Sequence, residues 1–148
     1  MMKMQVQKKL NLYQLTVLFS VFFSLFFALL GFSYNVWRME VTEENSNIRT
    51  ASFEVLLTLS SLEQLVYSAH YDRDEQEGNP RKGWAKVGLI EDLSMLTSDS
   101  VQAQATSLKS VWAQHSQAMV EDRESADAIV KAIDSTRAEI KRVLTSLE

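Results

Sequence analysis

Residues 15–32 of this 148-residue chain form one apolar run, LTVLFSVFFSLFFALLGF. The charge-free stretch around it, residues 12–36, is 25 residues long, and a helix needs roughly 20 apolar residues to cross ~30 Å of hydrocarbon. In lipid the backbone must satisfy its own hydrogen bonds, so such a run spans as a helix. Tyr13 and Trp37 lie at its two ends, where interfacial aromatic residues are common. We therefore predict a single transmembrane helix over residues 12–36.

A cleaved signal peptide is the alternative for this stretch. Signal peptides have apolar regions of roughly 7–15 residues followed by small residues at the cleavage site. The run here is longer, and Gly31 with Ser33 makes a weak cleavage site. These features favour an uncleaved signal anchor.

The flanking charges predict the orientation. Lys3, Lys8 and Lys9 precede the helix, whereas only Arg38 follows it before the first carboxylates. The positive-inside rule then places residues 1–11 in the cytoplasm as a short tail. Residues 37–148 would lie outside, which means the periplasmic side of a bacterial inner membrane.

The remainder of the chain predicts an all-α fold, because apolar residues recur there at alternating steps of three and four. Such spacing keeps side chains on one helical stripe. We expect an antiparallel helical bundle of three long helices and one shorter helix over residues 37–148. Three stripes carry the prediction: Ile48, Ser52, Val55, Leu59, Leu62, Val66 and Ala69; Val101, Ala105, Leu108, Trp112, His115 and Met119; Ala126, Ile129, Ile133, Thr136, Ile140, Val143 and Leu147. Phe53, Leu56 and Leu65 are expected to widen the first stripe.

Capping signals predict where the helices begin. Asn79 and Pro80 fit the N-cap and first position of the shorter helix, which should run to about Leu96. Asp99 resembles the first residue of a capping box, and Asp122 or Ser125 should cap the last helix after an acidic turn. The shorter helix is expected to bury Trp84, Leu89, Ile90 and Leu93.

Composition excludes several function classes. Residues 38–148 carry 12 Lys and Arg against 19 Asp and Glu, a net charge of −7, which argues against binding nucleic acid. The chain has no cysteine, so a disulfide framework and a thiol nucleophile are excluded. No catalytic motif is present, and we expect neither enzymatic activity nor a cofactor. The acidic loop after His70 misses the spacing of a calcium loop, so a solvated loop is the better interpretation.

Two sets of residues are candidate contact sites. Asn79, Pro80, Arg81 and Trp84 form a Pro-, Arg- and Trp-containing corner, and Trp and Arg are common interface anchors; an ordinary turn is the alternative. Ser20, Ser24 and Ala28 recur every four residues along the membrane helix, a pattern that lets helices approach closely. A plain lipid anchor is the alternative there.

This architecture predicts a non-enzymatic accessory or adaptor subunit of a membrane complex. Its contacts would be the lipid bilayer and either a membrane-protein partner or further copies of itself, because an 11-residue cytoplasmic tail is too short for an output domain. The order of one membrane helix followed by an acidic helical bundle also resembles the extracytoplasmic part of a bacterial chemoreceptor or histidine kinase. That resemblance implies, as the alternative, a sensory or ligand-binding module that signals through a partner. A coiled-coil-like homo-oligomeric scaffold is the third interpretation.

Overall fold

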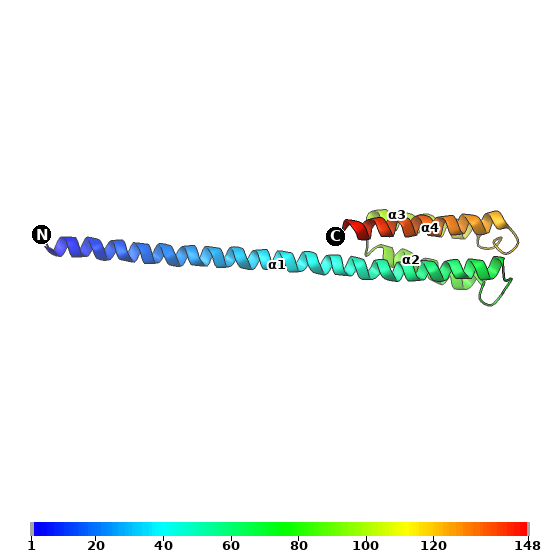
Figure 1. Cartoon of the computed structure of the whole chain (residues 1–148), viewed down its shortest axis with the longest axis horizontal. Helices are drawn as coiled ribbons and strands as arrows, with labels where there is room; N and C mark the ends of the chain where they lie inside the picture. Colours follow the sequence, from blue (N-terminus) through cyan, green and yellow to red (C-terminus); the bar gives the residue numbers. More distant parts are fainter. Residues whose placement is uncertain (1, 148) are drawn as a thin grey trace. The chain divides into compact units, whose positions relative to one another are not determined.

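The computed structural model describes residues 2–147, with side chains described for residues 13–147 (Figure 1). It consists of four α-helices, α1 (Met2–His70), α2 (Pro80–Ser94), α3 (Asp99–His115) and α4 (Arg123–Ser146), and residues 2–147 contain no strand. The predicted all-α fold is confirmed. The chain divides into two compact units, Met1–Glu43 and Glu44–Glu148, which are described separately below.

In the first unit, residues 13–43 belong to α1 and expose their side chains throughout. Within residues 13–147, Tyr13–His70 is the helix long and apolar enough to cross a membrane. None of its most apolar window is buried, which distinguishes it from the core helix of a soluble protein. A signal sequence near the N-terminus can meet the same criteria of length and hydropathy. Lys3, Lys8 and Lys9, which carry the orientation argument, lie outside the residues with described side chains.

The second unit contains the end of α1 together with α2, α3 and α4, and successive helices run antiparallel (Figure 1). The three predicted stripes face its core. Fourteen of their residues are fully buried: Ser52, Val55, Leu59, Leu62, Val66, Val101, Ala105, Leu108, Trp112, Met119, Ile129, Ile133, Thr136 and Ile140. Val87 and Ile90 of α2 complete this cluster. The four helices of the second unit therefore fill the core with their own side chains.

Two features of the first stripe and of α3 differ from the sequence-based expectation. Phe53 does not widen the core stripe, because it points away from the buried side of α1 and is 58% exposed. α3 ends at His115 rather than continuing to the acidic turn. The His115 carbonyl accepts the backbone N–H groups of Ala118 and Met119, so the chain tightens into turns while Met119 remains buried.

The helix caps follow the predicted chemistry at two of three places. Asn79 caps α2 by accepting the Arg81 N–H at 2.9 Å, and Asp122 caps α4. The third cap is Ser98, not Asp99. Ser98 has the extended backbone of an N-cap residue, and its hydroxyl accepts the Val101 N–H, whereas Asp99 lies in the first turn, where its charge suits the helix dipole.

Candidate functional site

The rotation of α2 determines which of its side chains reach solvent. Gly83, Val87, Ile90 and Ser94 face the core. Gly83 lies so close to the indole of Trp112 that a Cβ at this position would be 2.0 Å from Cζ2. This close approach fixes the inward face of α2.

The same rotation overturns the expected burial of two large side chains. Trp84 is 40% exposed and Leu89 is 48% exposed. A helix turns by roughly 100° per residue, so the two residues, five positions apart, lie about 140° apart on α2. They therefore occupy opposite flanks of the buried face. The sequence prediction failed here because it treated every large apolar residue of α2 as a core residue.

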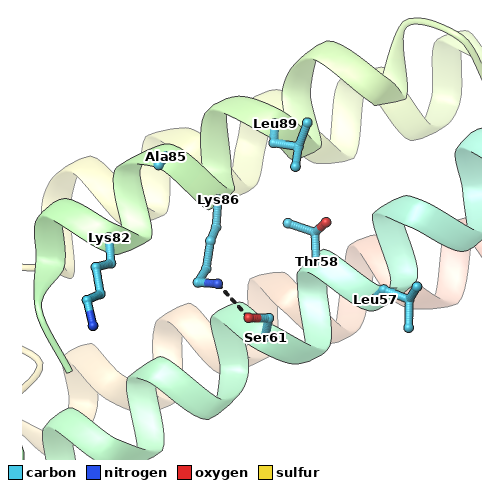
Figure 2. A pocket seen from close by; sticks show the side chains of 7 residues that line it. All are labelled: Leu57, Thr58, Ser61, Lys82, Ala85, Lys86 and Leu89. Carbon is cyan, nitrogen blue, oxygen red and sulfur yellow. Dashed lines mark hydrogen bonds between the residues drawn. The ribbon is translucent and has the colours of Figure 1, made fainter. Parts of the chain in front are cut away.

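A groove of about 500 Å³ lies along the Leu89 flank, between α1 and α2 (Figure 2). Its lining consists of Leu57, Thr58 and Ser61 from α1 and Lys82, Ala85, Lys86 and Leu89 from α2. These two helices supply every lining residue, so the groove has two walls rather than an enclosing shell.

The two lysines are the charged residues of this lining, and they differ in their partners. Lys82 pairs with Glu77 at 3.0 Å in an exposed ion pair. Lys86 reaches across to α1, where its ammonium donates a hydrogen bond to the Ser61 hydroxyl at 2.5 Å (Figure 2). Within residues 13–147, no carboxylate lies within salt-bridge distance of Lys86. The half-buried ammonium has three donors and uses one of them on a neutral acceptor.

A polar recess of about 270 Å³ adjoins the groove and shares Ser61, Lys82 and Lys86 with it. Its remaining lining side chains are Gln64, Leu65, Ser68 and Glu77. The groove thus has an apolar part near Leu57 and Leu89 and a polar part toward the loop before α2.

Two exposed apolar side chains lie on α1, and one of them, Leu57, lines the groove. Phe53 and Leu57 are one helical turn apart, and Leu57 is 66% exposed. Neither belongs to the bundle core. The sequence carried a signal for this surface, because Phe53 and Leu57 on α1 and Lys82 and Lys86 on α2 each repeat at four-residue spacing off the core stripes.

The predicted corner around Trp84 is only partly available at the surface. Asn79 and Pro80 are partly buried as the N-cap and first residue of α2, while Arg81 and Trp84 are exposed. None of the four lines the groove. Asn79 and Pro80 therefore have a structural role at the start of the helix, and Arg81 and Trp84 form a second surface.

The predicted packing residues of the apolar segment are all exposed on α1. Ser20, Ser24 and Ala28 remain at four-residue spacing within an uninterrupted helix, which keeps them on one face. Their neighbours on this segment include stacked phenylalanines, with the rings of Phe19 and Phe23 5.9 Å apart.

The loop after α1 is organised by backbone hydrogen bonds. The Asp74 carboxylate accepts the N–H groups of Gln76 and Glu77 at 2.8 and 3.0 Å. The backbone N–H groups of Glu77 and Gln76 lower the pKa of Asp74 because they favour its charged form. The residues with described side chains contain no group of three His, Cys, Asp or Glu placed to hold a metal ion.

Both histidines join different segments of the bundle. His70 Nδ1 lies 2.8 Å from the Met119 carbonyl, and His115 Nδ1 lies 3.0 Å from the Ser125 hydroxyl. That hydroxyl donates to Asp122, the cap of α4, at 2.5 Å. His115 is thus a partly buried, hydrogen-bonded residue of the α3–α4 connection.

Comparison with known proteins adds no relative. No family model, no curated protein and no solved structure matches this chain.

Proposed function

We propose that this chain is a non-enzymatic, single-pass membrane protein that acts as an accessory or adaptor subunit of a membrane complex. The apolar segment would be a retained signal anchor, with the N-terminus in the cytoplasm and the bundle on the extracytoplasmic, periplasmic side of a bacterial inner membrane. The bundle would dock a partner protein through the groove between α1 and α2.

One observation carries this proposal. The bundle fills its own core, yet Leu57 and Leu89 remain exposed in one groove. Exposed apolar side chains that gather at a concave surface are typical of protein contact sites. Grooves with two helical walls are also typical of surfaces that accept a partner helix.

The anchor rests on length, composition and lack of burial. The apolar stretch is long enough for the hydrocarbon layer, and its side chains are exposed in the structure. The lysines before it and the carboxylates after it support the proposed orientation. A reporter active only outside the cytoplasm, fused after Leu147, should be active in cells, and an inactive reporter would contradict this orientation.

Site-specific photocrosslinking in intact cells tests the docking role. A photoreactive amino acid at Leu57 should give an adduct with a membrane protein, whereas the same group at exposed Lys131 on α4 should not. A third position, Trp84, tests the second surface. Adducts with further copies of this chain alone, or equal adducts at Leu57 and Lys131, would overturn the adaptor proposal.

The polar recess favours a second candidate function, a sensory module that binds a small polar ligand. Its lining of Ser61, Gln64, Ser68, Glu77, Lys82 and Lys86 offers both hydrogen-bond donors and acceptors. A bundle whose thermal midpoint rises with polar metabolites at millimolar concentration, and which gives no Leu57 adduct, would support this candidate instead.

A further inference from the structure

We propose that the occupant of the groove is an amphipathic helix of a partner protein that carries carboxylates on its apolar face, with Lys86 as the residue that selects it. This inference rests on the docking function proposed above and specifies the chemistry of the partner.

The charge of the groove supports an acidic occupant. Residues 38–148 carry a net charge of −7, yet both charged residues lining the groove are lysines. Opposite charges on two surfaces raise specificity and association rate, and like charges there reject the wrong partner. An acidic face therefore fits this groove better than a basic one, although the surrounding domain is acidic.

The hydrogen bonds of Lys86 point to the same chemistry. Its ammonium is half-buried and bonded to the neutral Ser61 hydroxyl, with no carboxylate in salt-bridge distance among residues 13–147. A carboxylate from outside would accept one of its remaining N–H groups as a charge-assisted hydrogen bond. Lys82 already has Glu77 at 3.0 Å, so Lys86 is the better recognition residue.

The spacing of the lining residues indicates a helix. Lys82 and Lys86 are one helical turn apart, and Leu89 continues the same flank of α2. On the opposite wall, Leu57 and Ser61 are also one turn apart. An occupant with apolar side chains and carboxylates at three- and four-residue spacing matches both walls at once.

The test uses the full-length chain in nonionic detergent and three fluorescently labelled, capped peptides. Each peptide is a helix of about 18 residues, long enough to be helical, with leucines at three- and four-residue spacing and two Glu, two Gln or two Lys one turn apart. Binding is measured by anisotropy, with the signal of empty micelles subtracted.

The wild-type chain should bind the Glu peptide roughly five- to tenfold more tightly than the Gln peptide, and bind the Lys peptide most weakly. Lys86→Gln should bring the Glu and Gln peptides to within about twofold of each other, and Lys86→Glu should prefer the Lys peptide. Lys131→Gln, which removes the same charge from α4, should keep the wild-type preference. Leu57→Gln should weaken the binding of all three peptides by a similar factor.

Two results would overturn the inference. One is equal binding of the Glu and Lys peptides by the wild-type chain. The other is an equal loss of preference in Lys86→Gln and Lys131→Gln, which would assign the effect to overall charge. In either case a heterologous photocrosslink at Leu57 would leave the adaptor function standing, so failure of the acidic-helix proposal is distinguishable from failure of the docking function.

Discussion

Glu63 of α1 and Arg137 of α4 form an ion pair at 2.6 Å, with 21% of each side chain exposed. Arg137 also contacts Asp134 on its own helix, so the guanidinium holds two carboxylates while it joins the first and last helices of the bundle. A partly buried ion pair of this kind stabilises the fold more than an ion pair in open water does, provided that both partners remain charged.

A double-mutant cycle on this pair should give a measurable coupling. We expect Glu63→Gln and Arg137→Met each to lower the free energy of unfolding by about 1–2 kcal/mol, because each leaves a partly buried charge with fewer partners. The coupling energy should be about 1 kcal/mol by urea denaturation followed by circular dichroism. The exposed pair Arg73–Glu121 is the matched control and should give less than about 0.5 kcal/mol. Equal coupling in the two cycles would contradict this account.

Gly83 should tolerate no side chain. Gly83→Ala would place a Cβ against the ring of buried Trp112, and we expect it to destabilise the bundle by about 1–3 kcal/mol despite the better helix propensity of alanine. Gly88, in the same helix, has open space around the position of a Cβ. Gly88→Ala should therefore stabilise the chain by up to ~1 kcal/mol. Thermal midpoints of the two variants that shift in the same direction would refute the packing argument.

Glu139 should make stability depend on acid pH. Arg142 first, and then Ser100, lower its pKa from 4.5 to about 2 through hydrogen bonds to its carboxylate. Because the folded pKa is depressed, this contribution is present above pH 4.5 and is lost as pH falls from 4.5 through about 2. Glu139→Gln should therefore lose less stability than the wild-type chain between neutral pH and pH about 3, measured as urea midpoints. If the urea midpoint falls with pH equally in the variant and in the wild-type chain, Glu139 is not the cause of the pH dependence.

The apolar segment should insert only while its centre stays uncharged. Phe22→Arg places a cation near the middle of the run, at a cost of about 2.5–3.5 kcal/mol on insertion scales. We expect it to shift part of the protein into the soluble fraction after alkaline extraction of membranes. Ser33→Arg, near the end of the run, is the control, because an arginine there can reach the interface. Equal extraction of both variants would argue against a spanning helix.

Self-association of the apolar segment tests the small-residue face. Replacing Ser20, Ser24 and Ala28 together with leucine should reduce pairing in a genetic reporter of transmembrane association, because bulky residues prevent close approach of two helices. The matched control replaces Leu18, Leu25 and Leu29 with isoleucine, which changes little volume on another face. An unchanged reporter signal in the first variant would identify a plain anchor.

The sequence was sufficient for the core but not for the surface. Steps of three and four predicted the buried side chains of α1, α3 and α4, because a long amphipathic helix has one obvious apolar stripe. α2 has only 15 residues, with apolar side chains on more than one flank. Periodicity therefore could not show that Ile90 is buried and Leu89 is exposed. The rotation of α2 about its axis is fixed by the contact of Gly83 with Trp112. This contact joins residues of different helices, so the local sequence does not predict it.

The groove was missed for a related reason. Its walls come from two helices joined by a loop, and Ser61 and Lys86 meet across 25 positions of the chain. Local spacing places Phe53 and Leu57 on one side of a helix but cannot show what faces them. The caps, in contrast, depend on neighbouring residues, and Asn79 and Asp122 were predicted correctly for that reason.

The pairing of helices also has a consequence for how the bundle folds. α2 packs on α3 and α3 packs on α4, and each pair is joined by a short connection. Contacts between neighbouring segments close small loops, and chains dominated by them fold in microseconds to milliseconds. The Glu63–Arg137 contact, by comparison, joins positions 74 residues apart. We expect the contact between α1 and α4, which closes this large loop, to form after the contacts between neighbouring helices.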